Sequence, residues 1–180
     1  DDTKDIDDAI SVKKLKNGGF ELSTYIADVS HYVKEGSAID EDAYKRGTSV
    51  YPPGSVEPML DHKLSNGICS LNPNADRLAL AYTTIFDKFG KPIDFKVELA
   101  IINSKKKMTY SAVNDILEKD EIREDYQEYL KDIYIMYELS LLIYNQFLNS
   151  GYLNFISTES EVILDEFGTP IGIKDRDTGP

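Results

Sequence analysis

The chain has 180 residues, of which 41% are hydrophobic and only 11 are Gly and 7 are Pro, so it is long and apolar enough for one folded domain and is not a disordered tail. Its 20 Lys and Arg stand against 32 Asp and Glu, and the net charge of −12 excludes a protein that binds nucleic acid through overall positive charge. The longest apolar runs fall far short of the roughly 20 residues of a membrane span, and no signal peptide precedes the acidic start, so we expect a soluble protein with no membrane partner. Cys69 has no partner for an internal disulfide, which favours a reducing compartment.

Aspartate dominates the first eight residues, and the chain turns apolar directly afterwards. Carboxylates this close repel one another unless a cation or solvent compensates, and hard cations such as Mg²⁺ prefer oxygen ligands. Asp5, Asp7 and Asp8 are therefore candidate metal ligands, although an acidic chain terminus without function is an equally good reading of the spacing alone. Since side chains alternate faces in a strand, a shared ion predicts irregular backbone at residues 6–8.

The next hundred residues predict two β-hairpins with a helix and a loop between them. Residues 9–15 and 20–29 are strand-like and flank a turn at residues 17–19. Ser37 and the acids after it predict a short helix that ends near Gly47. Proline and glycine indicate an irregular, site-forming loop over residues 50–75. Residues 78–86 and 93–102 predict the second hairpin.

The last third is predicted to be mainly helical. Residues 111–117 predict a short helix, and apolar residues spaced by three or four predict one long amphipathic helix from Ile122 that ends before Gly151. Its tyrosines are expected in the core. Residues 161–164 and 170–173 predict a final hairpin. We expect a single α+β domain over residues 1–180, with an antiparallel or mixed β-sheet packed by α-helices.

Several ordered blocks carry a family resemblance. They are Asp-Thr-Lys-Asp-Ile-Asp-Asp-Ala at 2–9, Ile-Ala-Asp-Val-Ser-His-Tyr-Val at 26–33, Gly-Thr-Ser-Val-Tyr-Pro at 47–52, Lys-Leu-Ser-Asn-Gly-Ile-Cys-Ser-Leu-Asn-Pro at 63–73, Ser-Lys-Lys-Lys-Met-Thr-Tyr at 104–110 and Gly-Tyr-Leu-Asn-Phe at 151–155. In order and spacing they resemble the catalytic (RNB) domain of the ribonuclease II and ribonuclease R family, and are more similar to ribonuclease R.

The resemblance implies a hydrolase of the exoribonuclease II type that removes nucleotides from the 3′ end of single-stranded RNA and releases nucleoside 5′-monophosphates. It implies Mg²⁺, with Mn²⁺ as a substitute, held by Asp5, Asp7 and Asp8 as catalytic residues. Tyr51 and Phe155 match positions that clamp bases, and Tyr110 matches a catalytic position that contacts the terminal nucleotide. Stacking on aromatic rings binds single strands without reading their sequence, at roughly 1–3 kcal/mol per base.

The resemblance also implies that this chain is the N-terminal part of a longer, cytoplasmic protein. The family's most upstream aspartate would lie two residues before Asp1. The C-terminal half of the catalytic domain, with an arginine and a glutamate of the active site, and the flanking cold-shock and S1 domains would be partners outside the chain. We therefore expect these 180 residues alone to be inactive.

Two other classes of function compete with a nuclease. A calcium-binding EF-hand loop needs Gly at its sixth position and Glu at its twelfth, and counting from Asp1 or from Asp5 meets neither requirement. A noncatalytic RNA-binding or scaffold domain with the same fold stays open, although the retained aspartates argue against it.

Overall fold

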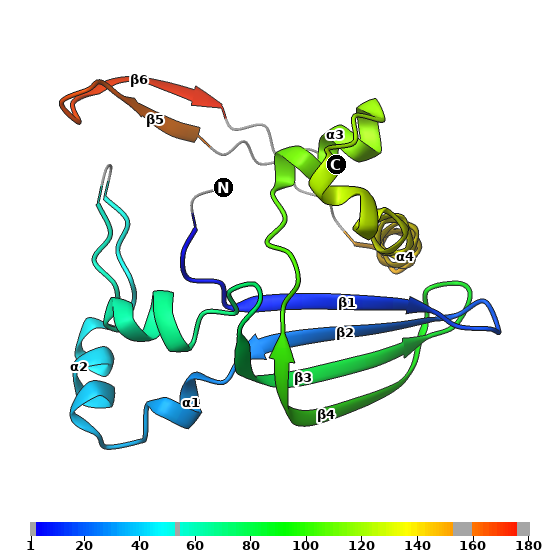
Figure 1. The fold of residues 1–180 in the computed structure, drawn as a ribbon, viewed down its shortest axis with the longest axis horizontal. Helices are drawn as coiled ribbons and strands as arrows, with labels where there is room; N and C mark the ends of the chain where they lie inside the picture. Colours follow the sequence, from blue (N-terminus) through cyan, green and yellow to red (C-terminus); the bar gives the residue numbers. More distant parts are fainter. Residues whose placement is uncertain (1–2, 53–54, 153–159, 176–180) are drawn as a thin grey trace.

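The computed structural model describes residues 3–52, 55–152 and 160–175. Its centre is a four-stranded sheet in which β1 (Asp8–Lys14), β2 (Phe20–Ala27), β3 (Asp76–Phe86) and β4 (Pro92–Asn103) pair antiparallel in chain order. Figure 1 shows this sheet with α3 and α4 on one side of it and α1 and α2 at one end. The predicted α+β class is confirmed, and the sheet is antiparallel.

The first hairpin forms as predicted, because its turn is built by local hydrogen bonds. The Asn17 side chain accepts a hydrogen bond from the Gly19 amide at 3.0 Å, and Gly18 adopts a φ of 83°, which glycine tolerates best. The prediction of strand up to Val29 is wrong, since β2 ends at Ala27. The Asp28 carboxylate caps the short helix α1 (Val29–Tyr32) by accepting from the His31 amide at 3.1 Å.

Helix α2 (Ala38–Arg46) confirms the predicted helix and its two ends. The Ser37 hydroxyl accepts from the Asp40 amide at 3.3 Å, and Gly47 ends the helix with a φ of 73°. The region predicted as a loop is irregular in most of its described residues, and contains one short helical segment, η1 (Lys63–Ile68), that the sequence reasoning missed.

The predicted long helix is wrong at its start. α3 (Tyr110–Lys119) is followed by a tight 3₁₀ segment, η2 (Glu124–Tyr129), and only then by α4 (Leu130–Asn149). The cause is tertiary: the buried Tyr126 side chain packs in one cluster with Ile116 of α3 and Ile133 of α4, and its hydroxyl accepts from the Thr109 amide at 3.1 Å. This packing pulls the segment out of the helical path that its apolar spacing favours.

A second cluster joins α4 to one end of the sheet. Val12, Phe20 and Phe86 pack with Leu139 of α4, and Phe20 is fully buried. Burying such side chains stabilises the fold by about 1.5–3 kcal/mol each. The prediction that the tyrosine stripe lies in the core is confirmed for Tyr126, which is buried, and is wrong for Tyr137 and Tyr144, which are exposed.

The last hairpin pairs β5 (Ser160–Leu164) with β6 (Pro170–Asp175), as predicted, and lies apart from the sheet in Figure 1. Among the described residues, none of the helices has the length and apolar content to cross a bilayer.

Candidate functional site

A buried serine holds the aspartate segment against the sheet. The Ser70 hydroxyl accepts a hydrogen bond from the Ile6 amide at 3.0 Å and donates one to the Lys4 carbonyl at 2.8 Å. The Leu71 amide donates to the Ile6 carbonyl at 2.9 Å. Ser70 is fully buried, so this hydroxyl has a defined place between the two backbone groups. Asp5 is thereby held between two fixed residues.

The chain changes its hydrogen-bonding partner within the aspartate cluster. The Ile6 carbonyl pairs with Leu71, whereas the Asp7 carbonyl accepts from the Ala27 amide of β2 at 2.8 Å. Asp8 is then the first residue of β1 and lies opposite Ile26. Ile6 and Asp7 precede the strand, and the predicted irregular backbone is wrong at Asp8, which is the first residue of β1. This change of partner places successive carboxylates at the point where regular strand geometry begins.

The three carboxylates act on one another electrostatically. Partial burial raises the pKa of Asp7, and the negative charges of Asp5 and Asp8 raise it further. The same cluster reaches a neighbouring thiol, because burial first and then the charges of Asp7 and Asp28 raise the pKa of Cys69. Cys69 is buried, as the sequence predicts, and its raised pKa marks a structural thiol and not a nucleophile.

Tyr51 reaches the aspartate cluster from the loop after α2. Its hydroxyl donates to the Asp5 carboxylate at 3.4 Å, and its ring is 64% exposed. A pair of backbone hydrogen bonds between Val50 and Glu57, each 2.9 Å long, closes the base of this loop. The arrangement leaves an aromatic ring in solvent beside a carboxylate.

Tyr110 lies where the connection from β4 enters α3. It is the first residue of α3, which Thr109 caps, and it is 79% exposed. Three residues earlier, the Lys107 ammonium donates to the Thr3 carbonyl, so the connection from β4 to α3 contacts the aspartate segment. The structure therefore brings Asp5, Asp7, Asp8 and Tyr51 together, and joins the segment before Tyr110 to them. Phe155 lies outside the described residues.

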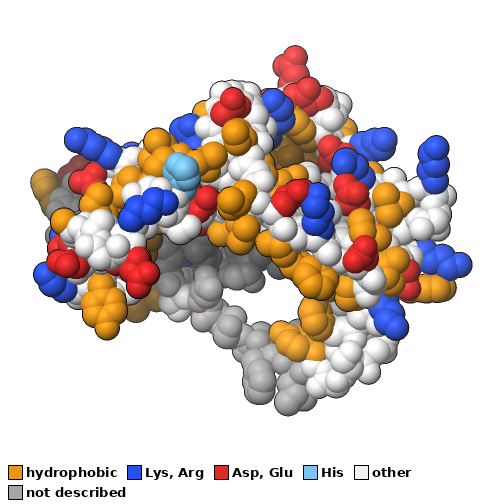
Figure 2. All heavy atoms as spheres, turned by 90° about the horizontal axis from the view of Figure 1, so that it is seen from below, with side chains coloured by type: hydrophobic (Ala, Val, Ile, Leu, Met, Phe, Trp, Pro, Cys, Tyr) orange, Lys and Arg blue, Asp and Glu red, His pale blue; other side chains and the backbone are white. Residues whose placement is uncertain are grey.

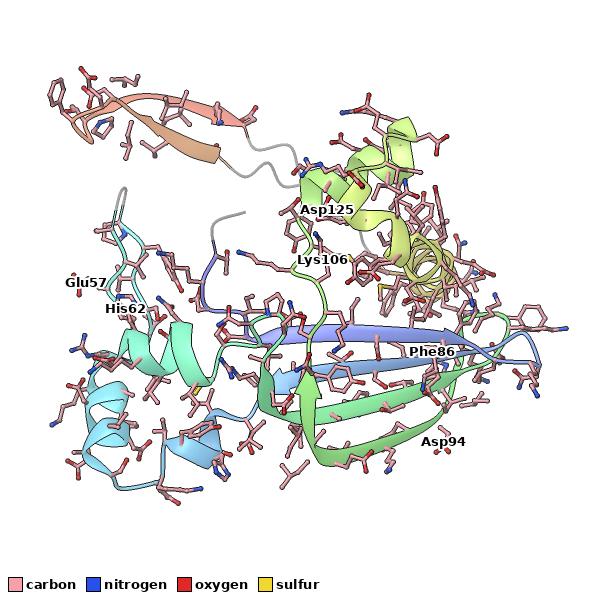
Figure 3. All side chains as sticks on the ribbon, viewed as in Figure 1. Glu57, His62, Phe86, Asp94, Lys106 and Asp125 are labelled. Carbon is pink, nitrogen blue, oxygen red and sulfur yellow. The ribbon has the colours of Figure 1, made fainter. Side chains whose placement is uncertain are left out.

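The lysine run of this connection is engaged within the protein. Lys105 donates to the Asn103 side chain at 2.8 Å, and Lys106 forms an ion pair with Asp125 and lies 4.5 Å from the centre of the Tyr126 ring. Figure 3 shows Lys106 and Asp125 close to each other beside α3. An open pocket of about 480 Å³ lies here, lined by the three lysines, Asp125, Glu128, Tyr129, Pro73 and Asn74.

A divalent cation fits the aspartate cluster in charge and in donor type. All three side chains offer hard oxygen ligands, and the pKa of Asp7 is raised first by burial and then by the charges of Asp5 and Asp8, which a cation would offset. Over residues 3–52, 55–152 and 160–175, no three His, Cys, Asp or Glu side chains are grouped closely enough to hold one ion. Mg²⁺ is commonly held by one or two carboxylates together with water and substrate phosphates, which needs no such cage.

Sequence reasoning missed Ser70, although it positions the segment. The residue stands in an apolar stretch between Cys69 and Leu71. A buried hydroxyl in such a place needs partners, and this was the available signal. Its partners, the Ile6 amide and the Lys4 carbonyl, lie more than sixty residues away in the sequence and could not be predicted from it.

Comparison with known proteins gives a consistent result. The RNB domain family model matches residues 1–180. Ribonuclease R of Thermotoga maritima is 46% identical over 180 residues, which cover 99% of this chain and 25% of that protein, and ribonuclease R of Mycoplasmopsis pulmonis is 48% identical over 175 residues, covering 97% and 24%. The structure of Mycoplasma genitalium RNase R in complex with ribose-methylated single-stranded RNA superposes with a TM-score of 0.93 at 35% identity, covering 99% of this chain and 28% of that one.

The chain thus spans about a quarter of the length of the curated relatives it matches. The match over all 180 residues, the identity above 40% and the shared fold agree with one another. The chain belongs to the RNB domain family.

Proposed function

We propose that this chain is the metal-binding and RNA-binding portion of a 3′-to-5′ exoribonuclease that hydrolyses single-stranded RNA to nucleoside 5′-monophosphates. The observation that carries the proposal is the aspartate cluster at the start of β1, with the Tyr51 hydroxyl on the Asp5 carboxylate, in a chain of the RNB family. It combines ligands for a cation with an exposed aromatic ring in one place.

Asp5, Asp7 and Asp8 would hold Mg²⁺, or Mn²⁺ in its place. When bound between carboxylate and phosphate oxygens, such an ion lowers the pKa of a water molecule and stabilises charge on the leaving oxygen. Of the protein groups, Ser70 fixes the backbone on both sides of Asp5, and the pairing of Asp7 and Asp8 with β2 fixes the other two. The backbone of the cluster is fixed in this way, and water and phosphate oxygens would complete the coordination that the carboxylates begin.

Tyr51 would stack on a base near the 3′ end of the RNA, and Tyr110 would contact the terminal nucleotide. Both rings are exposed, and their elements are tied to the aspartate segment by the Tyr51–Asp5 and Lys107–Thr3 hydrogen bonds. Phe155 is proposed as a second stacking residue from the family resemblance alone. Stacking tolerates any base, which suits an enzyme that shortens RNA regardless of sequence.

We also propose that activity needs polypeptide outside these 180 residues. The matched relatives are about four times as long as the matching segment. The remaining part of the catalytic domain, and cold-shock and S1 domains, would supply further active-site groups and most of the positive charge for RNA. The protein would act in the cytoplasm.

The test measures Mg²⁺-dependent release of mononucleotides from labelled single-stranded RNA. It uses the full-length protein that carries residues 1–180, its Asp7→Asn variant and an Asp94→Asn control, together with the 180-residue chain. Asp94 is exposed on β4, where it pairs with Ile85 near the end of the sheet that lies away from Asp8, and its replacement removes the same charge. Titration of Mn²⁺ into each protein gives a second readout that is independent of turnover.

We expect release by the full-length protein and by the Asp94→Asn variant, and a loss of about two orders of magnitude or more, with weaker Mn²⁺ binding, for Asp7→Asn. Full-length protein that binds RNA without degrading it would replace the nuclease by the noncatalytic RNA-binding alternative. Rapid turnover by the 180-residue chain would contradict the need for further polypeptide.

A further inference from the structure

One face of the four-stranded sheet carries a row of large apolar side chains. Residues that lie opposite each other in antiparallel strands point to the same face. The register pairs Ile26 with Leu80 and Leu80 with Leu99, and it pairs Tyr82 with Val97 and Leu78 with Ile101. We call the part of this face formed by these exposed residues the open face: Ile26, Leu80, Tyr82, Val97, Leu99 and Ile101.

Helix α4 covers only the other end of the same face. There Val12 and Phe20 are buried against Leu139, whereas Leu99 is 76% and Ile101 71% exposed. The Tyr82 ring stacks on the Phe95 ring with 5.6 Å between centroids, which further aligns apolar groups on the sheet surface. No element in the described part of the chain buries these side chains. Figure 2 shows the molecule from the side away from α3 and α4, where hydrophobic side chains are interspersed with charged ones.

The opposite face of the sheet carries smaller and more polar side chains. Ser23 and Thr83 share a hydrogen bond of 2.8 Å there, and the Lys13 and Glu21 side chains form an ion pair of 2.8 Å. Ala79 lies on this face and is 1% exposed. The large apolar side chains of the sheet that are exposed gather on the open face, and a face of this composition is one that packs against a core.

We infer that the open face is the docking surface for further polypeptide of the same protein, a segment outside residues 1–180 that presents aliphatic and aromatic side chains. The RNase R structure shares this fold over 99% of the chain, yet the shared part is 28% of that protein. A large apolar patch on a stable monomer marks an interaction site. A protein of this length offers ample chain to cover it.

The register adds a consequence for the aspartate cluster. Asp8 pairs with Ile26, so it lies in the same row and on the same face as Leu80 and Leu99. A segment that covers the open face therefore borders the aspartate cluster. The inference itself needs no nuclease activity, because it rests on packing alone.

Thiol labelling tests the inference in a background in which Cys69, and any cysteine outside residues 1–180, is replaced by serine. Leu99→Cys reports on the open face, and Glu98→Cys, the neighbouring residue on the opposite face, is the matched control. Each is introduced into the 180-residue chain and into the full-length protein, and the rate of maleimide labelling is measured at several protein concentrations.

We expect Cys at position 99 to react about tenfold more slowly, or slower still, in the full-length protein than in the 180-residue chain, and Cys at position 98 to react equally in both. Equal rates at position 99 would overturn the inference. Protection in the 180-residue chain that grows with its concentration, without protection in the full-length protein, would also overturn it, since the occupant would then be a second copy. Equal protection of both positions would show burial of the whole edge strand and would overturn docking on one face.

Discussion

The two ends of one sheet face differ in how they are covered. At the end next to the β1–β2 turn, α4 buries Val12, Phe20 and Phe86, while at the Asp8 end the apolar side chains of β3 and β4 stay exposed. The strands are the same and the residue types are similar. The difference shows that the apolar pattern of a strand encodes a face to be buried, and that another part of the polypeptide decides where burial occurs.

The largest expected effect separates the stability of these two ends. Phe20→Ala removes a fully buried ring, so we expect the free energy of unfolding to fall by about 3–5 kcal/mol. Leu99→Ala in the same 180-residue chain removes an exposed side chain and is expected to cost less than about 1 kcal/mol. Urea denaturation followed by circular dichroism measures both. Equal losses would show that the open end is buried in solution and would break the comparison.

A second prediction concerns the clamp at the Asp8 end. Ser70→Ala leaves the Ile6 amide and the Lys4 carbonyl without their partner, so we expect a loss of about 1–3 kcal/mol. Amide hydrogen exchange at Ile6 is expected to become faster. Ser11→Ala is the control, because its hydroxyl contacts only the Tyr25 hydroxyl on an exposed surface. Unchanged exchange at Ile6 would mean that the backbone is held by β2 and Leu71 alone.

The fold was predictable where its signals are local. The turn at Asn17 and the Ser37 and Gly47 helix ends depend on residues close in sequence, and each forms as predicted. The break before α4 was not predictable from periodicity, because Tyr126 is drawn away by packing against α3. In such places tertiary contacts, which depend on the whole fold, override the helical preference of the local sequence.

The candidate site was predictable only in its charged part. The aspartates are visible as a cluster in the sequence, and their mutual effect on the pKa of Asp7 follows from their spacing. The approach of Tyr51 to Asp5 joins residues 46 positions apart, and the Ser70 contacts join residues more than 60 apart. The family resemblance pointed to Tyr51 as a binding residue, whereas the apolar neighbours of Ser70 indicated only that its hydroxyl needs partners and not which ones.

A third prediction is that replacing a residue of the candidate site stabilises the fold in the absence of metal. Burial and the charges of Asp5 and Asp8 raise the pKa of Asp7, so its ionised form destabilises the folded state. Without metal at neutral pH, Asp7→Asn is expected to raise the free energy of unfolding by less than about 1 kcal/mol. With added Mn²⁺ the order is expected to reverse, since wild type binds the ion more tightly than Asp7→Asn and gains more stability from it. Thermal unfolding with and without Mn²⁺ measures both, and the Asp94→Asn variant should follow wild type in each case.

The smallest expected effect on stability comes from an ion pair between the connection after β4 and the segment before α4. Lys106, on the connection from β4, pairs with Asp125 of η2, immediately before the helix that covers the sheet. The hydrogen bond from Lys106 lowers the pKa of Asp125, so the pair stabilises the fold above the carboxyl group's unfolded pKa, and this contribution is lost as the pH falls through the folded value. Because Asp125 is exposed, solvent screens the pair and the effect is small. Asp125→Asn is therefore expected to lower the melting temperature slightly at neutral pH and to match wild type in strongly acidic buffer, where both carry no charge at this position. Glu124→Gln, which removes a neighbouring charge without this partner, is the control, and an equal loss in that variant would assign the effect to the general charge of η2.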